Sequence, residues 1–469
     1  MPAPEAQAVK AAPHISGKEI WTLTWPQALM MFFQFLVGFT DVWVAGHISR
    51  DTQAVLGIVT QCQFLLLIVG TALASGSIAA ISQSLGAKLP ARAMRYGGMV
   101  LKYGLAFSVV ALVLAILFRR PLLVLLQVPE SIFDLAQYFW LLFMASVPSN
   151  YLLSLTGAMF RARRMVFIPL GSAMLACAVN AVTATGFGLG WWGFPDLGVE
   201  GMALATFCSV TVAGFFSLAM AVKRGILRRA AFAPWRWEKR AMAYLIRVAA
   251  PAGGLSIFWQ TGYLVLFAVA ASLPRDSVNA LAGMTAGMRV ESIIFLPAIA
   301  FNMTASMLVG HSLGAGDKVE AKRVAGRIVL LGSVIMSVGA LCLWPFVPRI
   351  AAFVAPDPGA QVHAIEYLKY NLLGTPFSVV SMTLGGVLSG AGAALYSFVV
   401  FSSAIWLVRL PLAWLFGHVV IGESWGVFLA MFISQVVQSL VILYVFRRKD
   451  WARFAMTAKR MKTVARKTP

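Results

Sequence analysis

Charged side chains are scarce in this sequence. Asp, Glu, Lys and Arg make up 12% of its 469 residues, whereas hydrophobic residues make up 60%. A soluble globular chain carries about 25% charged residues, so this composition excludes that class. Apolar stretches of roughly 20 residues recur along nearly the whole length, and they predict an all-α, polytopic integral membrane protein.

Marks of several other protein classes are also missing. The four cysteines lie in apolar runs and show no CxxC or zinc spacing. No Gly-x-x-x-x-Gly-Lys motif occurs, which argues against an ATP-driven pump within this chain. The spans contain no cluster of metal ligands and no Ser/His arrangement, so we expect neither an enzyme nor a cofactor. The first apolar run is too long for a signal peptide and is expected to be a retained helix.

The apolar runs predict twelve transmembrane helices. We place them at 20–47, 53–81, 95–118, 133–160, 164–190, 199–222, 242–271, 278–309, 324–347, 363–389, 394–418 and 425–446. The longest polar connection divides them into two bundles of six. The expected organisation is an N-terminal segment (1–19), an N-lobe (20–222), a linker (223–241), a C-lobe (242–446) and a basic tail (447–469).

Acidic residues are fewer than basic ones, 17 against 38. With the N-terminus placed in the cytoplasm, the inner segments and the tail hold 28 Lys and Arg, and the outer loops hold five. This asymmetry predicts a protein of the inner (plasma) membrane with both termini cytoplasmic. It also explains most of the basic excess without nucleic acid. The tail is either a positive-inside anchor or a patch for anionic lipids.

The two halves look related. The sequence SQSLGAK (82–88) leaves the second span, and GHSLGAG (310–316) leaves the eighth; a basic loop follows each. Because six spans are an even number, the second half enters the membrane in the same direction as the first. The pattern therefore predicts a parallel repeat about a pseudo-two-fold axis along the membrane normal, with alternating access between two bundles.

The most unusual charge is Asp41, in FLVGFTDVWVAGHIS (35–49), because it lies inside an otherwise uncharged first span. An ionised group at membrane depth costs roughly 2.5–3.5 kcal/mol on the insertion scale, so it is a functional candidate by default. Burial disfavours the charged form of a carboxylate, which lets a proton bind and leave near the working pH. Asp41 is either a proton-coupled cation site or a structural hydrogen-bond acceptor.

Further buried polar positions lie in both halves. Arg289 and Glu291 are two residues apart, so on a helix they point to nearly opposite sides and each needs another partner. Arg409 is a candidate partner for Glu291, either in a structural ion pair or in transport. Asn180 either joins two helices or shares a site with Asp41.

Two kinds of backbone feature fall within the predicted spans. Pro26 and Pro297 are expected to interrupt the first and eighth spans and to let them bend. The GxxxG at Gly386–Gly390 is expected to serve close helix packing.

Together these residues resemble the multidrug and toxic compound extrusion (MATE) transporters, over about residues 20–446. The motifs are Pro26 with GFTDVWVAGHIS, SLGA after the second span, Asn180 with LGVEGMALAT (197–206), MRVES…LPAIAF, GHSLGAGD, GVLSGAG (386–392) and VRLPLAW (408–414). The arginine–glutamate pair and RLPLAW are similar to the DinF-like branch.

The resemblance implies a V-shaped exporter of organic cations or amphipathic drugs, driven by inward flow of H⁺ or Na⁺, and we expect it to be monomeric. Asp41 matches the essential aspartate of the first helix, and Asn180 and Thr206 match its polar partners. Pro26 matches the proline whose bend is proposed to accompany protonation.

Two departures bear on the coupling ion. Ala184 stands where some members have a second aspartate, and Gln260 stands where others have a glutamate in the seventh helix. Sodium favours several oxygen ligands, whereas one carboxylate suffices for H⁺, so H⁺ is favoured over Na⁺. Glu291 remains a candidate second acid. The alternative function is a flippase for lipids or lipid-linked oligosaccharides, which would typically line its cavity with several basic residues.

Overall fold

The computed structural model describes residues 15–456, and within this range the chain forms helices and no strand. The predicted segments 1–19 and 447–469 therefore lie partly outside the described residues. The first half contains α1(Gly17–Ile48), α2(Arg50–Gly86), α3(Pro90–Leu117), α4(Arg119–Leu125), η1(Glu130–Ile132), α5(Phe133–Ala145), α6(Val147–Ala162), α7(Phe167–Leu189), η2(Trp191–Gly193), α8(Gly198–Lys223) and η3(Arg229–Ala231).

The second half follows the same plan. It contains α9(Trp235–Ala271), α10(Ser277–Ile294), α11(Leu296–Gly314), α12(Lys318–Leu343), η4(Trp344–Phe346), α13(Val347–Val354), α14(Pro358–Gly390), α15(Ala394–Ser403), η5(Ala404–Arg409), α16(Leu410–Trp414), η6(Leu415–Val420), α17(Ser424–Arg448) and η7(Trp451–Phe454). The segments η5 and η6 are π-helical.

The helices account for the predicted spans. Eleven described segments are long and apolar enough to cross a membrane, and α10 with α11, bent by 42°, makes a twelfth. Pro297 stands in the first turn of α11, directly after this bend, so the predicted interruption of the eighth span is confirmed. The prediction for the first span is wrong in this structure, because α1 continues through Pro26 without a break.

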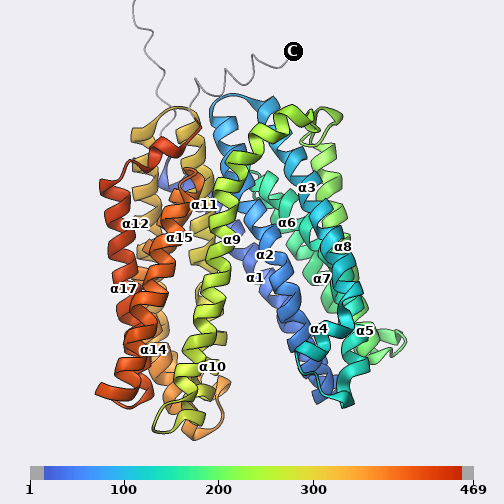
Figure 1. The fold of residues 1–469 in the computed structure, drawn as a ribbon, viewed down its shortest axis with the longest axis vertical. Helices are drawn as coiled ribbons and strands as arrows, with labels where there is room; N and C mark the ends of the chain where they lie inside the picture. Colours follow the sequence, from blue (N-terminus) through green and yellow to red (C-terminus); the bar gives the residue numbers. More distant parts are fainter. Residues whose placement is uncertain (1–14, 457–469) are drawn as a thin grey trace, which may run out of the picture.

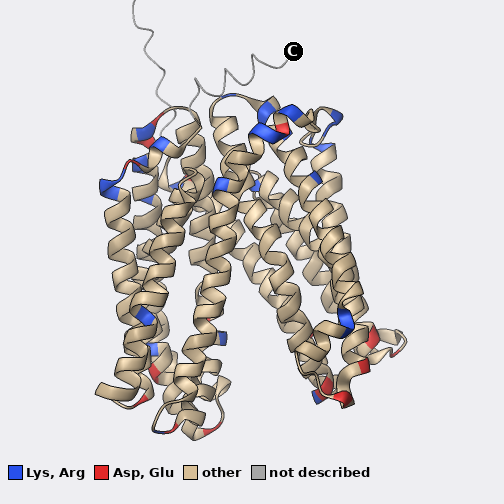
Figure 2. Ribbon diagram, viewed as in Figure 1, with Lys and Arg blue, Asp and Glu red and all other residues tan. Residues whose placement is uncertain are grey.

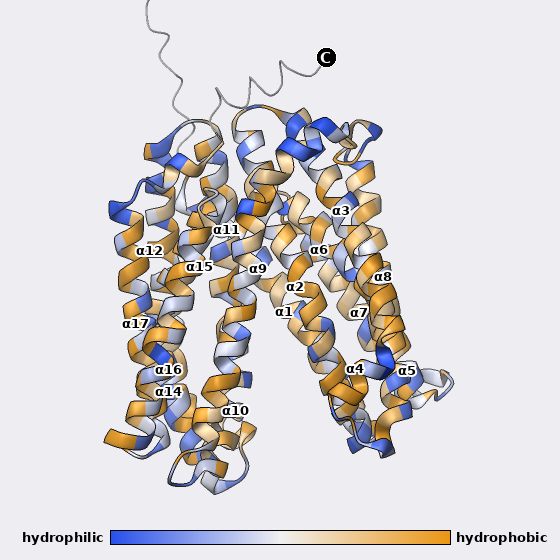
Figure 3. Ribbon diagram, viewed as in Figure 1, coloured by the Kyte–Doolittle hydropathy of each residue, from blue (hydrophilic) through white to orange (hydrophobic). Residues whose placement is uncertain are grey.

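The helices gather into two bundles, α1–α8 and α9–α17, which lie close together at one end and diverge toward the other (Figure 1). Large apolar side chains remain exposed along both bundles, as expected for surfaces that face lipid. Hydrophobic residues occur along most of the length of both bundles (Figure 3). The connection between the bundles is shorter than the predicted linker, because α9 begins at Trp235. Glu238 anchors this first turn by accepting hydrogen bonds from Lys102 and Tyr103.

The bundles are joined where the repeated Ser-Leu-Gly-Ala motifs meet. A Cβ at Gly86 would overlap the carbonyl oxygen of His311, and a Cβ at Gly314 would overlap that of Gln83. Gln83 Nε2 donates to the Gly390 carbonyl at 2.6 Å, and His311 Nε2 lies 2.8 Å from the Ala162 carbonyl. Because Gln83 and His311 both precede Ser-Leu-Gly, each lobe contributes an equivalent contact to the other.

The first helix of each lobe crosses to the partner lobe. Thr24 and Gln27 of α1 donate to Thr304 of α11, at 3.0 and 2.8 Å. In the second lobe, Leu245 and Ala249 of α9 pack against Gly76 of α2. These crossed pairs repeat the same geometry in both halves and support the predicted parallel repeat.

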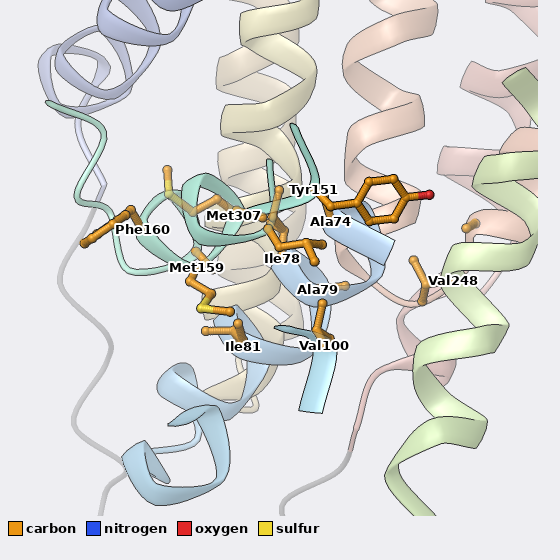
Figure 4. Packing of buried hydrophobic residues seen from close by; sticks show 14 of the residues in the cluster. Ala74, Ile78, Ala79, Ile81, Val100, Tyr151, Met159, Phe160, Val248 and Met307 are labelled. Carbon is orange, nitrogen blue, oxygen red and sulfur yellow. The ribbon is translucent and has the colours of Figure 1, made fainter. Parts of the chain in front are cut away.

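The core lies at this junction (Figure 4), where buried side chains of five helices interdigitate. Those in view include Ala74, Ile78, Ala79 and Ile81 of α2, Val100 of α3, Tyr151, Met159 and Phe160 of α6, Val248 of α9 and Met307 of α11. Lipid is as apolar as these residues, so close packing rather than the hydrophobic effect holds the helices together. The GxxxG prediction is confirmed, since added Cβ atoms at Gly386 and Gly390 would overlap carbonyl oxygens of α11.

Candidate functional site

Asp41 lies at the meeting point of α1, α7 and α8, with 6% of its surface exposed. Asn180 Nδ2 of α7 donates to Asp41 Oδ1 at 2.9 Å, and Thr206 Oγ1 of α8 donates to the same oxygen at 3.0 Å. The structure thus brings together the three residues that the sequence analysis placed in one polar network. Three separate helices supply one residue each.

Small residues allow these helices to approach so closely. A Cβ at Gly201 of α8 would overlap the Phe187 carbonyl of α7, and a Cβ at Gly188 would press against Val44 of α1. Ala184, one turn after Asn180, is fully buried and offers no oxygen to the site. The carboxylate is therefore surrounded by tight packing and held by two neutral donors.

The hydrogen-bond arrangement leaves two groups free to reorganise. Thr206 Oγ1 also lies 3.4 Å from the Met202 carbonyl, so its single hydroxyl hydrogen has two acceptors within reach. Asn180 Oδ1 is buried and has no donor among residues 15–456. A site with a spare acceptor and a rotatable donor suits a carboxyl group in either protonation state.

A second polar site lies in the C-lobe, around a cavity of about 550 Å³. Gln260, Glu291 and Arg409 line it, together with aromatic side chains such as Trp259, Tyr263, Phe295 and Phe401. Phe64 of α2 reaches it from the N-lobe. Three of the four predicted second-lobe residues thus share one cavity.

Arg289 does not belong to this cavity. It is exposed on α10, whereas Glu291 is buried on the same helix. The prediction that the two point to different sides is confirmed, and the grouping of Arg289 with the cavity residues is not supported.

Glu291 and Arg409 are neighbours without a direct ion pair. Tyr367 of α14 donates a hydrogen bond to Glu291 Oε2. Arg409 Nε donates to Ser434 Oγ at 2.8 Å, and its guanidinium faces the rings of Trp259 and Tyr263 at 5.7 and 5.8 Å. No salt bridge within 4.0 Å joins Glu291 and Arg409 in the described chain, so the two do not form a direct ion pair. Their charges are still close enough to attract each other.

Sequence reasoning missed Tyr367, Ser434, Trp259 and Tyr263. The buried charges signalled that partners must exist, but the chain has 32 Phe, 14 Trp and 10 Tyr, most of which could face lipid. Nothing in the spacing separates a cavity aromatic from a lipid-facing one. Only the three-dimensional arrangement of α9, α14 and α17 identifies these four.

Known proteins are similar to both halves of this chain. The MatE family model matches residues 26–185 and again 251–415, which is more than half of the chain and covers both halves. The probable multidrug resistance protein NorM of Thermotoga maritima is 23% identical over 451 residues, covering 95% of each chain. The multidrug resistance protein PmpM of Pseudomonas aeruginosa is 28% identical over 416 residues, covering 85% of this chain and 84% of the relative.

Solved structures share the fold. The bent form of the Vibrio cholerae MATE transporter VcmN superposes with a TM-score of 0.86 at 18% identity, over 94% of this chain and 98% of that one. A Pyrococcus furiosus transporter of the MOP superfamily, described as having a binding pocket of reverse polarity, gives 0.85 at 17% identity over 94% and 97%. With the family model matching both lobes and this fold shared throughout, the chain belongs to the MatE family of membrane transporters rather than to any class of enzyme.

Proposed function

We propose that the protein is a secondary active multidrug exporter that exchanges H⁺ for cationic or amphipathic compounds by alternating access, with Asp41 as the coupling site. The family and the relatives named multidrug resistance proteins support the exporter. The observation that carries the coupling is the buried Asp41 carboxylate held by Asn180 and Thr206.

The contacts around Asp41 accommodate both protonation states. When the group is ionised, the Thr206 hydroxyl and the Asn180 amide both donate to Oδ1. When a proton binds, Thr206 can turn its hydrogen to the Met202 carbonyl and accept from the new carboxyl hydrogen, while Asn180 Oδ1 offers a further acceptor. The neutral acid no longer attracts a cation, so proton entry favours release of a cationic substrate.

The two-lobed fold supplies the movement. The lobes are packed at the Gly86 and Gly314 junction, and their helices diverge toward the opposite end (Figure 1). In the proposed cycle this is the state that is open at the diverging end. Rocking about the junction would open the other side. A potential of 100 mV is worth about 2.3 kcal/mol per charge, which supports roughly a fifty-fold gradient of a neutral solute per proton without ATP.

The orientation follows from charge. Lys and Arg concentrate at the end where the lobes meet, and most of the acidic residues lie at the opposite end (Figure 2). We place the basic end in the cytoplasm of a cell with the protein in its inner membrane, so that the open end faces outward. The protein then works as a monomer surrounded by membrane lipids.

Proton coupling is preferred over sodium coupling because the Asp41 site holds a single carboxylate. Neither the buried Ala184 beside Asn180 nor Gln260 in the C-lobe cavity contributes a second negative charge. Sodium requires several oxygen ligands, and carboxylates are the strongest of them.

A lipid or lipid-linked oligosaccharide flippase is the second candidate, and one observation favours it. Arg409 is a buried cation on the wall of the C-lobe cavity, where it could hold a phosphate. The cavity also contains Glu291, which would repel a phosphate, so the exporter remains the preferred function.

Dye efflux from cells tests the proposal. Wild-type cells should expel a cationic dye while the proton gradient is intact, independently of Na⁺, and cells with Asp41→Asn should not. Normal efflux by Asp41→Asn would show that Asp41 is structural. Efflux that stops when Na⁺ is removed would show that Na⁺, not H⁺, is the coupling ion. If neither wild type nor any variant expels the dye, the flippase would be favoured.

A further inference from the structure

The connection between the two lobes, residues 223–240, carries an exposed basic surface at the end of the molecule where Lys and Arg concentrate (Figure 2). Its one acid, Glu238, is buried and accepts hydrogen bonds from Lys102 and Tyr103 of α3. The surface of the connection therefore presents positive charge with no exposed acid of its own. All of its basic side chains are exposed, namely Lys223, Arg224, Arg228, Arg229, Arg236, Lys239 and Arg240.

This surface differs from the other basic regions at the same end. None of its basic side chains forms an ion pair within 4.0 Å in residues 15–456. The bias of positive charge toward inner loops explains why basic residues are present, but it does not explain why these lack acidic partners. Positive charge that no side chain neutralises attracts an anionic partner. Elsewhere at this end acidic partners are close: Arg164 has Glu19, Lys318 has Asp450, and Arg323 has Glu320.

The connection lies against α3 at the depth of the membrane interface. A Cβ at Gly98 of α3 would overlap the carbonyl oxygen of Ala231, and Lys102 Nζ lies 3.0 Å from Glu238 Oε2. The predicted membrane span of α3 begins at residue 95, so both of these contacts fall within about its first two turns. The start of α9 is therefore held at the level of phospholipid headgroups.

The first turns of α9 separate charge from the buried face. Arg236, Lys239 and Arg240 are three or four residues apart, so they share one face of the helix. The buried Trp237 and Glu238 lie on the other face, against α3. The helix thus presents three cations together, away from the protein.

Two exposed aromatic side chains flank this basic face. Phe232 precedes α9 and is 56% exposed, and Trp235 begins the helix and is 65% exposed. Aromatic side chains beside Lys and Arg are typical of the membrane interface, where the rings enter the boundary of the acyl chains and the charges meet phosphates. The surface therefore offers a contact for each part of an anionic phospholipid.

We propose that the face formed by Arg236, Lys239 and Arg240, together with Phe232 and Trp235, binds an anionic phospholipid of the cytoplasmic leaflet. The three cations hold the phosphate, and the two rings pack on the glycerol and acyl region. The name of the leaflet rests on the proposed orientation of the protein, whereas the binding does not. The bound lipid holds the covalent link between the lobes at the membrane interface.

Native mass spectrometry of the purified full-length protein in detergent tests the proposal. It measures the dissociation constants of phosphatidylglycerol and phosphatidylcholine, and we expect wild type to bind the anionic lipid more tightly. The triple variant Arg236→Gln, Lys239→Gln, Arg240→Gln should weaken phosphatidylglycerol at least about tenfold and leave phosphatidylcholine within about twofold. Equal affinity of the wild type for the two lipids would overturn the proposal, and this holds even if the triple variant fails to fold.

A second triple variant is the matched control for charge. Lys318→Gln, Lys322→Gln, Arg323→Gln removes the same number of exposed cations from the start of α12, where acidic partners are close. It should leave both lipids within about twofold. Equal weakening of phosphatidylglycerol by the two triple variants would overturn the proposal, because it would show attraction to total charge rather than to this face.

Two further comparisons define the ligand. Trp235→Ala should weaken both lipids, because the ring contacts the region that they share, and unchanged affinities would contradict the role of the aromatic residues. Ammonium phosphate in excess, compared with ammonium acetate of the same ionic strength, should not displace phosphatidylglycerol. Displacement would overturn the proposal in favour of a site for free phosphate. No transport is measured, so these outcomes are independent of the exporter function.

Discussion

The two lobes place a buried carboxylate in contrasting surroundings. Asp41 of the N-lobe accepts hydrogen bonds from two neutral donors in a tightly packed corner of three helices. Glu291 of the C-lobe accepts from Tyr367 and borders a cavity of about 550 Å³ shared with Arg409. The two repeats thus differ: one holds its carboxylate in a compact site, and the other holds its carboxylate beside an open cavity. Under the proposed function, the lobes would divide the work of an exporter although they share one fold.

The largest expected effect separates the two acids. Asp41→Asn should lower dye efflux by at least about tenfold, equivalent to 1.4 kcal/mol, because an amide cannot bind and release the coupling proton. Glu291→Gln should keep efflux that still varies with external pH. The measurement is the initial efflux rate of a cationic dye across a range of external pH. A pH response that disappears in Glu291→Gln and persists in Asp41→Asn would assign proton coupling to Glu291 of the C-lobe instead of Asp41.

The comparison also assumes that the lobes meet at one close junction. Gly314→Ala should destabilise the protein by about 1–3 kcal/mol, because the added methyl group would overlap the Gln83 carbonyl. Gly326→Ala is the matched control, since nothing lies within 4 Å of its Cβ position in α12. That change should be neutral or stabilising by up to about 1 kcal/mol. Thermal unfolding in detergent compares the two, and equal effects would argue against the tight junction.

A smaller effect is expected from the hydroxyl beside Asp41. Thr206→Val removes one hydrogen bond, worth about 1 kcal/mol, and should slow efflux about fivefold. Thr206→Ser keeps the hydroxyl and should restore most of the rate. Efflux assays on both variants at equal expression check the result. A serine variant as slow as the valine variant would assign the effect to packing.

The smallest effect should come from making the C-lobe cavity more acidic. Gln260→Glu adds a carboxylate to the wall that holds Glu291 and Arg409. Attraction at partly hydrated sites is modest, so affinity for the cationic dye rhodamine 123 should rise about threefold. Rhodamine 110 has a free carboxylate where rhodamine 123 has a methyl ester. Its affinity should fall, because that carboxylate meets a new negative charge. If both affinities fall, the substitution has disturbed the cavity rather than its charge.

The predictable part of the molecule is the part that follows from local pattern. Apolar length predicted the helices, and the lone charge of Asp41 predicted a buried site with partners. Asn180 was a candidate partner from its place in the fifth span, and Thr206 from the family resemblance; both donate to the same carboxylate oxygen. The contact between Gln83 and Gly390 was not predictable, because equivalent motifs in a sequence do not show that they face each other.

The C-lobe shows where sequence reasoning fails. Arg289 and Arg409 look alike as charges within apolar runs, but one is exposed and the other is buried. The difference depends on the rotation of each helix about its axis and, for Arg409, on the π-helical segment before Pro411. A continuous helix through Pro26 was likewise unpredictable, because packing against α11 can hold a proline within a helix.

The central claim is that Asp41 carries the proton that drives export. The most direct measurement uses proteoliposomes with a pH-sensitive fluorophore inside and an imposed gradient of a cationic dye. Wild type should move protons against the flow of dye, and Asp41→Asn should bind the dye but move no protons. Proton movement of wild-type size in Asp41→Asn would contradict the claim and place the coupling site elsewhere in the protein.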